Sequence, residues 1–270
     1  MNGRRAIVGL CMLCALLVSA FAAQSASAIS GTTSFTCVKG AEPKDLRGEH
    51  CLKEGLPAKE YGHVAIAQDE TTELEITSKN TSNNTTTGTA QVFKSTIAGF
   101  GATLSATEVH GNGWMKNELD VATGEHYSVG HVTLTFTGVT SNLPGCVVST
   151  DTSPTEMGEN GVVHTGPLKI TTTGQGDSSK IEPTEAGKPI ATFYLTGCNT
   201  AGFNGTYTVT GNLTCKPEGA TVNCNHAEVT TQNTLKLNGA KAGQEGPVTV
   251  KARANSGQPY TPISPTTVTT

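Results

Sequence analysis

Apolar and polar residues alternate along several short segments of the chain. In "HVTLTFTG" (131–138), Val132, Leu134 and Phe136 fall on one side and threonines fall on the other. The same period of two recurs in three later segments, which are 206–215, 233–239 and 247–252, and the segment 190–197 is more fully apolar. This period is typical of β-strands that bury one face. About a dozen such short strands can be placed along the chain.

Turn signals separate the alternating segments. Gly211-Asn212 and Asn238-Gly239 each predict a tight turn, and the first of them favours a hairpin between the two runs that flank it. "KPEG" (216–219) predicts a further turn, which the flanking cysteines would clamp. No segment after residue 28 has the 3.6-residue apolar period of a helix. We therefore expect an all-β fold: an antiparallel β-sandwich, or two packed sandwiches, with disulfides and no helices beyond a signal peptide.

Composition supports this fold class and leaves the number of domains open. The chain holds 44 threonines, and threonine favours pleated strands because its side chain is branched at Cβ. We expect a cysteine-stapled N-terminal segment over 29–60, followed by one β-sandwich domain over 61–270. The alternative is a division into two sandwiches near 174–188, where the chain is polar and rich in loop-forming residues.

Residues 1–28 have the order of a secretory signal peptide. Arg4 and Arg5 precede an apolar run over 6–23, and Ala26-Ser27-Ala28 forms a cleavage site of the small-x-small type. A membrane anchor is the alternative reading, because the apolar run approaches the length of a span. The run leads directly into the cleavage site and not into a charged stop, which favours the signal peptide. We expect a secreted, extracellular protein that has no membrane span after cleavage.

Export changes how the cysteines are read. Six cysteines follow residue 28, and an even number outside the cytosol indicates disulfides. Proximity in the sequence suggests the pairs Cys37–Cys51 and Cys215–Cys224, which leaves Cys146–Cys198 as the third. The sequence alone does not choose among the 15 possible connectivities.

The charge balance argues against some partners. Without residues 1–28 the chain has 16 basic and 22 acidic residues, a formal charge of −6. Binding to nucleic acid needs clustered cations, and the densest basic stretch is only Lys251-Ala252-Arg253. We therefore expect no nucleic-acid partner, and an extracellular glycan or a cell-surface component is the candidate partner.

Four segments in a fixed order resemble a known set of proteins. They are "TCVKG" (36–40), "YGHVAIA" (61–67), "IATFYLTGCNTAGFNGTYTVTGNLTC" (190–215) and "KAGQEGPVTV" (241–250). Together they are similar to a large set of exported proteins from soil actinobacteria. The resemblance implies an exported, β-rich, cysteine-stapled protein, and it assigns no activity, cofactor or site residue.

Functional side chains are densest in the segment 108–131. The candidate ligand-binding residues there are Trp114, Tyr127, His110, His126, His131, Glu118 and Asp120. If 101–110 pairs with 129–137, His110 and His131 approach each other. Three interpretations remain open: a decorated hairpin with Trp114 packed in the core, a carbohydrate-binding face on which Trp114 and Tyr127 stack on sugar rings, and a histidine metal site.

Catalytic signals are weak. His50 lies directly beside Cys51, but Cys37 is 14 positions from Cys51, unlike the close cysteine pairs of zinc sites. Carboxylate pairs that would suit glycoside hydrolysis are Asp69/Glu70, Glu73/Glu75 and Glu118/Asp120. We expect no cofactor, no metal and no catalytic residue, and a binding or structural role. The alternatives are a secreted carbohydrate-binding protein and a carboxylate-dependent glycan hydrolase.

Overall fold

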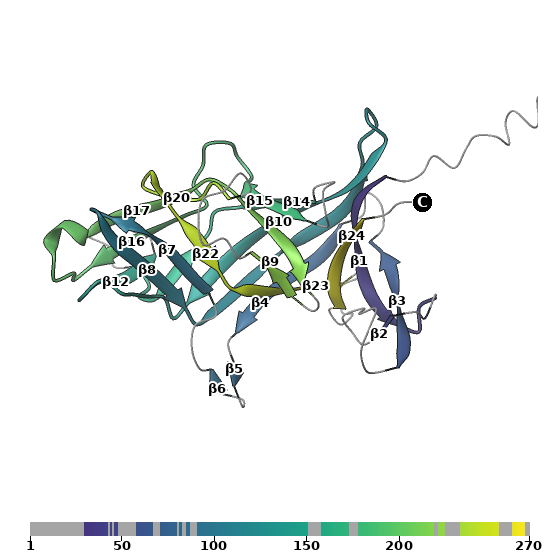
Figure 1. Cartoon of the computed structure of the whole chain (residues 1–270), viewed down its shortest axis with the longest axis horizontal. Helices are drawn as coiled ribbons and strands as arrows, with labels where there is room; N and C mark the ends of the chain where they lie inside the picture. The colour runs from purple at the N-terminus through teal and green to yellow at the C-terminus, as the bar shows by residue number, and fades with distance from the viewer. Residues whose placement is uncertain are drawn as a thin grey trace, which may run out of the picture.

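The structure is a computed structural model that describes residues 30–42, 44, 46–47, 58–66, 71–79, 81–82, 85–86, 91–150, 158–172, 178–218, 221–224, 233–253 and 261–267. Within these residues the regular structure is strand, and one short 3-10 turn, η1 (Ala201–Phe203), interrupts it. The expectation of an all-β, antiparallel, disulfide-bonded fold is confirmed. The strands form one large sheet and smaller sheets packed against it (Figure 1).

The large sheet has thirteen strands and runs through the whole molecule. Its order is β19-β18-β15-β14-β10-β9-β4-β23-β24-β1-β3-β2, and β13 pairs with β10 beside this path. The strands, in chain order, are β1 (Ser30–Lys39), β2 (Leu46–Arg47), β3 (Lys59–Ala65), β4 (Thr72–Lys79), β9 (Glu108–Leu119), β10 (Glu125–Thr137), β13 (Val162–His164), β14 (Leu168–Thr172), β15 (Ser179–Pro183), β18 (Leu213–Glu218), β19 (Thr221–Asn223), β23 (Pro247–Arg253) and β24 (Thr261–Thr267).

Part of the large sheet closes on itself. β19 pairs with β18 on one side and also with β23, where Val222 lies opposite Val248. Eight consecutive strands of the path, from β19 through β18, β15, β14, β10, β9 and β4 to β23, therefore form a closed antiparallel ring, which we call the ring. A second closure joins β1 to β10 in parallel over 30–32. Closure pairs the backbone groups that an edge strand would leave free.

Two smaller sheets pack against one end of the ring. In Figure 1 they lie on the left, β1, β2, β3 and β24 lie on the right, and the long strands β9 and β10 run between the two ends. The first small sheet contains β11 (Thr140–Ser141), β8 (Phe100–Ala106), β7 (Gln91–Ile97) and β22 (Gly243–Glu245). The second contains β12 (Val147–Thr150), β16 (Ala191–Thr196), β17 (Gly205–Thr210), β20 (Lys236–Leu237) and β21 (Ala240–Lys241). β5 (Thr81–Ser82) and β6 (Thr85–Thr86) form a separate two-stranded pair.

The core fills the ring and the space between the smaller sheets. Alternation on each strand turns one face inward: Leu168 and Ile170 on β14 and Phe193 and Leu195 on β16 are all buried. The predicted apolar face of 131–138 also points inward, because Val132, Leu134 and Phe136 belong to the core or pack against it. The period of two in the sequence therefore predicts correctly which side of these strands is buried.

One predicted turn is confirmed and another is wrong. Asn238 and Gly239 both have positive φ and join β20 to β21 as a two-residue hairpin. Gly211-Asn212 does not make a hairpin, because β17 pairs with β16 and β20 while β18 pairs with β15 and β19. The chain instead crosses there from a small sheet into the ring. Gly211 is needed at the crossing, since a Cβ would lie 2.2 Å from the carbonyl oxygen of Thr234.

Two of the three predicted disulfides are present. Cys146–Cys198 joins the start of β12 to the end of β16, and Cys215–Cys224 joins β18 to β19. Lys216, Pro217 and Glu218 lie in strand β18 and not in a turn, so the cysteines clamp a longer hairpin than the sequence predicts. Residue 219, the last of the predicted turn, lies outside the described residues.

Other predictions fall where the structure gives no description. The predicted signal peptide (1–28), Cys51 of the pair Cys37–Cys51, and His50 lie outside the described residues. The proposed division near 174–188 includes strand β15, which pairs with β14 and β18 in the large sheet. Among the described residues, no helix is long and apolar enough to cross a membrane.

Candidate functional site

The outward face of β4, β9, β10 and β14 carries five of the seven candidate side chains, which are Trp114, Tyr127, His110, His131 and Glu118. Inward positions on these strands are buried, as at Leu74 on β4 and Met115 on β9. Because successive residues point to opposite sides of a strand, Trp114 and its alternate neighbours on β9 point away from the core. We call this surface, formed by the outward residues of these four strands, the outer face.

Trp114 and His131 form a ring stack at the middle of the outer face. They lie directly opposite each other in the β9–β10 register. Their ring centroids are 4.6 Å apart and the ring planes differ by 14°. Both side chains are half-buried, so the stack is part of the molecular surface and Trp114 does not pack into the core. The interpretation of Trp114 as a core residue is therefore wrong.

Glu118 and Tyr127 lie opposite each other four residue pairs further along the same strands. The Tyr127 hydroxyl donates to Glu118 Oε2 at 2.5 Å, and Lys116 Nζ lies 2.5 Å from Glu118 Oε1. The hydrogen bonds from Lys116 and Tyr127 favour the ionised carboxylate and lower the pKa of Glu118. The outer face therefore carries a fixed carboxylate beside its aromatic stack.

The three histidines of this segment do not meet. His110 lies opposite Thr135, and its Nε2 is 3.1 Å from Glu108 Oε2. His131 lies opposite Trp114, so the predicted approach of His110 and His131 does not occur. The reason is the register: the hairpin pairs 108–119 with 125–137, whereas the prediction paired 101–110 with 129–137. His126 lies opposite Leu119, and its position in the alternation puts it on the other side of the strand from Tyr127 and His131.

Asp120 belongs to the turn that joins β9 to β10. Its Oδ1 accepts hydrogen bonds from the backbone N–H groups of Ala122 and Thr123, at 2.9 Å and 3.4 Å. The Ala122 bond is the main reason that the pKa of Asp120 is lowered. This geometry is that of an Asx turn, so the carboxylate shapes the loop.

The outer face continues from the stack to two open grooves that sequence reasoning missed. Lys169 on β14 lies opposite His131 and lines a groove of about 440 Å³ together with Glu182 and Asn212. On the other side of the 184–188 loop, His164 lines a groove of about 530 Å³. His164 is tied to the outer face, because its Nδ1 lies 2.9 Å from Thr135 Oγ1.

No sequence motif marks these grooves, because they form where β13 and β14 meet the chain around β15 and β16. Residues far apart in the sequence converge there, and each alone is an ordinary polar residue of a strand or loop. The only available signal was the polar composition of 182–188, which also predicts a plain loop.

The described residues give little support for a metal site or for a catalytic site. There, no three His, Cys, Asp or Glu side chains lie close enough together to hold a metal ion. Glu118 and Asp120 both have lowered pKa values, whereas the acid of a glycosidase requires a raised one. Glu73 lies opposite Trp114 and Glu75 lies opposite Asn112, on the same side of the sheet as the stack. What the outer face offers is aromatic surface with fixed charges and hydrogen-bonding groups around it.

Comparison of the chain with protein-family models, with curated proteins and with solved structures found no match.

Proposed function

We propose that this is an exported, non-catalytic protein that binds a polysaccharide on its outer face. The observation that carries the proposal is the Trp114–His131 stack, which lies on the solvent side of the sheet. Lys169 lies beside His131 on the next strand, and the Glu118–Tyr127 pair lies further along the same two strands. Disulfides support an oxidising compartment, because such bonds persist mainly outside the cytosol.

The chemistry of the outer face suits a sugar chain. A sugar ring has an apolar face that packs on an aromatic ring and a rim of hydroxyls that need hydrogen-bond partners. Trp114 supplies large aromatic surface, while Glu118, four residues along β9, supplies an acceptor and Lys169, two strands away, supplies a donor. The groove of about 440 Å³ beside Lys169 gives a path along which further sugar units would lie.

The lowered pKa values favour binding over hydrolysis. Glycoside hydrolysis needs one carboxylic acid that keeps its proton near neutral pH, which requires a raised pKa. Glu118 is stabilised in the ionised form by Lys116 and Tyr127, so it accepts hydrogen bonds and does not donate a proton.

The decisive experiment is a depletion assay on insoluble polysaccharides. The purified protein with oxidised disulfides is mixed with cellulose, chitin or a β-1,3-glucan, and the free protein is measured as a function of total protein. We expect saturable binding to at least one of them, and a loss of affinity of about tenfold or more in Trp114→Ala, because a central aromatic residue carries much of the binding energy.

Phe100→Ala is the matched control. Phe100 is an aromatic residue that is 61% exposed, and it lies on β8 in a different sheet. Its removal should leave polysaccharide binding unchanged. Absence of binding to every polysaccharide, or equal loss in both variants, would overturn the proposal. Release of reducing sugar that disappears in Glu118→Gln would establish the hydrolase instead.

A further inference from the structure

The interior of the ring contains a cavity of about 90 Å³, which we call the ring cavity. A closed sheet of eight strands has an interior that side chains just fill, or that holds one small ligand. Apolar side chains from opposite sides of the ring line this space, among them Met115, Ile170, Leu213 and Val250. The side chains of the ring therefore leave some of its interior unfilled.

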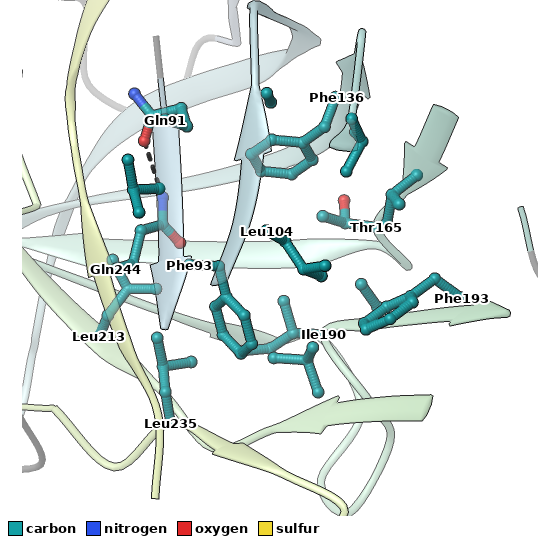
Figure 2. A pocket seen from close by; sticks show the side chains of 16 residues that line it. Gln91, Phe93, Leu104, Phe136, Thr165, Ile190, Phe193, Leu213, Leu235 and Gln244 are labelled. Carbon is teal, nitrogen blue, oxygen red and sulfur yellow. Dashed lines mark hydrogen bonds between the residues drawn. The ribbon is translucent and has the colours of Figure 1, made fainter. Parts of the chain in front are cut away.

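A second cavity, of about 80 Å³, lies between the two smaller sheets and the end of the ring; we call it the inter-sheet cavity. Figure 2 shows Phe93, Leu104 and Ile190 around this space and the Gln91–Gln244 hydrogen bond at its margin. The two cavities adjoin, because Phe136, Thr165, Ile190, Leu213 and Gln244 line both. A ligand that moves these shared side chains would occupy both cavities, as the two lobes of one elongated apolar space.

Unfilled apolar space inside a protein costs stability, because the atoms that line it lose packing contacts. An apolar cavity of about 150 Å³ stays dry and takes up molecules such as benzene. The two lobes together are of that order, so a molecule of up to about ten non-hydrogen atoms would fill them.

One polar atom inside the space has no protein partner. Ser34 is only 1% exposed, and among the described side chains its Oγ is buried without a hydrogen bond. Ser34 lines the ring cavity. Its backbone is held on both sides by Asn117, whose Oδ1 accepts from Ser34 N and whose Nδ2 donates to Ser34 O, each at 3.1 Å. The backbone of Ser34 is thus held in place while its hydroxyl is left unpaired, and a buried unpaired hydroxyl is unfavourable.

The charge of the ligand follows from the lining. Among the described residues that line the two cavities there is no Asp, Glu, Lys, Arg or His. A carboxylate or an amine would enter without a counter-charge, which is strongly unfavourable in an apolar site. The ligand must therefore be neutral, mostly apolar, and able to form one hydrogen bond.

We propose that the interior binds a small neutral amphiphile, an alkyl chain or single ring with one hydroxyl or carbonyl group. Its polar group pairs with Ser34 Oγ, and its apolar part extends past Phe136 and Leu213 towards the inter-sheet cavity. Partly buried residues at that end, Phe93 and Gln244, mark the side from which a ligand enters. This site is on the opposite side of the sheet from the outer face, so it is independent of polysaccharide binding.

The test uses 1-hexanol, 1-octanol and hexanoate with the purified oxidised protein. Ligand-detected NMR and thermal unfolding report binding. We expect both alcohols to bind and to raise Tm by about 2–8 °C at saturation, because a ligand that binds only the folded state stabilises it. Hexanoate, which has the same chain and a charge, should not bind.

Matched variants locate the site. Ile170→Phe fills the ring cavity and should abolish alcohol binding, whereas Ile97→Phe makes the same change at a buried position that lines neither cavity and should leave binding intact. Ser34→Ala should weaken 1-octanol binding by about tenfold and leave binding of toluene unchanged. Ser34→Ala should also leave the Tm of the ligand-free protein unchanged or higher, since the hydroxyl has no partner to lose.

A structural measurement covers the case in which Ile170→Phe does not fold. Crystals of the unmodified protein under xenon pressure should show xenon in the ring cavity. Binding of no neutral probe, equal binding in Ile170→Phe and Ile97→Phe, or a crystal structure with only water at Ser34 and no xenon would overturn the proposal.

Discussion

Asn117 is a polar side chain that the fold depends on. It lies in β9, is 5% exposed, and points into the interior. Besides holding both backbone groups of Ser34, it donates to the carbonyl of Ile66 at 2.8 Å and its Oδ1 accepts from Ser128 Oγ at 2.5 Å. A single amide therefore joins β9 and β10 to β1 and to the chain after β3. Buried polar groups are tolerated when they are paired in this way.

Asn117→Ala should lower the free energy of unfolding by about 3 kcal/mol or more, because the buried Ser34 N–H and Ile66 carbonyl lose the bonds that Asn117 makes to them, and Ser34 O keeps only its bond from Ile66 N. Urea unfolding measures the change. Asn142→Ala is the control: Asn142 makes bonds of the same kind, accepting from Thr103 N and donating to Gly101 O, but it is exposed. Its loss should cost about 1 kcal/mol or less. Equal effects would show that burial is not what makes Asn117 important.

At the scale of single residues, the sequence predicted which side chains crowd into one segment but not which of them contact each other. Trp114, Tyr127 and Glu118 were singled out as functional types crowded into one segment, and they do share the outer face. That Trp114 meets His131, and that Tyr127 meets Glu118, depends on a register of two strands. A shift of one residue in that register changes which side chains are neighbours, and nothing local in the sequence determines it.

The β9–β10 pair is the element that supports both proposed sites. Its outward residues form much of the outer face, and its inward residues form one wall of the ring. Three glycines on its inward side permit the close packing of this wall: Gly111, Gly113 and Gly130. A Cβ on Gly113 would lie 1.9 Å from the carbonyl oxygen of His131 and 2.8 Å from Val132 Cα. Because these are backbone atoms, the clash has no inexpensive relief.

Gly113→Ala should therefore destabilise the protein by about 3 kcal/mol, at the upper end of what overpacking costs. Gly111→Ala should cost less, because its closest contact is the flexible end of the Leu134 side chain. Gly101→Ala is the control, since a Cβ there meets nothing within 4 Å. Thermal unfolding of the three variants gives the order, and a Gly113→Ala protein as stable as Gly101→Ala would contradict it.

At the scale of elements, period two and turn residues predicted strands well and partners poorly. The runs at 131–138, 190–197 and 247–252 are strands β10, β16 and β23. Asn238-Gly239 predicted its hairpin because φ is positive at both positions of that turn. Gly211-Asn212 has similar composition, yet the flanking strands belong to different sheets, because their inward faces are buried against different partners.

Covalent bonds and sheet closure act on the whole molecule. Cys146–Cys198 spans 52 positions, and Cys215–Cys224 spans 9. In the chain-entropy description a longer loop gives more stabilisation, since the unfolded chain loses more freedom. The shorter bond has a local role: it clamps β18 to β19, the hairpin whose second strand closes the ring on β23.

Replacement of Cys146 and Cys198 by alanine should lower the free energy of unfolding by about 4 kcal/mol. The same replacement of Cys215 and Cys224 should cost about 2.5 kcal/mol from chain entropy. An added cost is expected because both cysteines line the ring cavity, which the smaller alanines would enlarge. Denaturant unfolding without reductant measures both. A change below about 1 kcal/mol for the first pair would mean that the reduced chain retains structure that makes the bond redundant.

The sequence by itself determined the class of this protein. Threonine-rich alternation requires strands with one buried face, and the spacing of the cysteines suggested two disulfides that the structure contains. These features are local, because propensity and periodicity act over a few residues. Only the tertiary structure decided four further features. They are the closure of eight strands into a ring, the Trp114–His131 stack, the grooves lined by Lys169 and His164, and the interior cavity lined by Ser34. Each depends on contacts between segments that lie tens of residues apart, and packing of the whole chain selects those contacts.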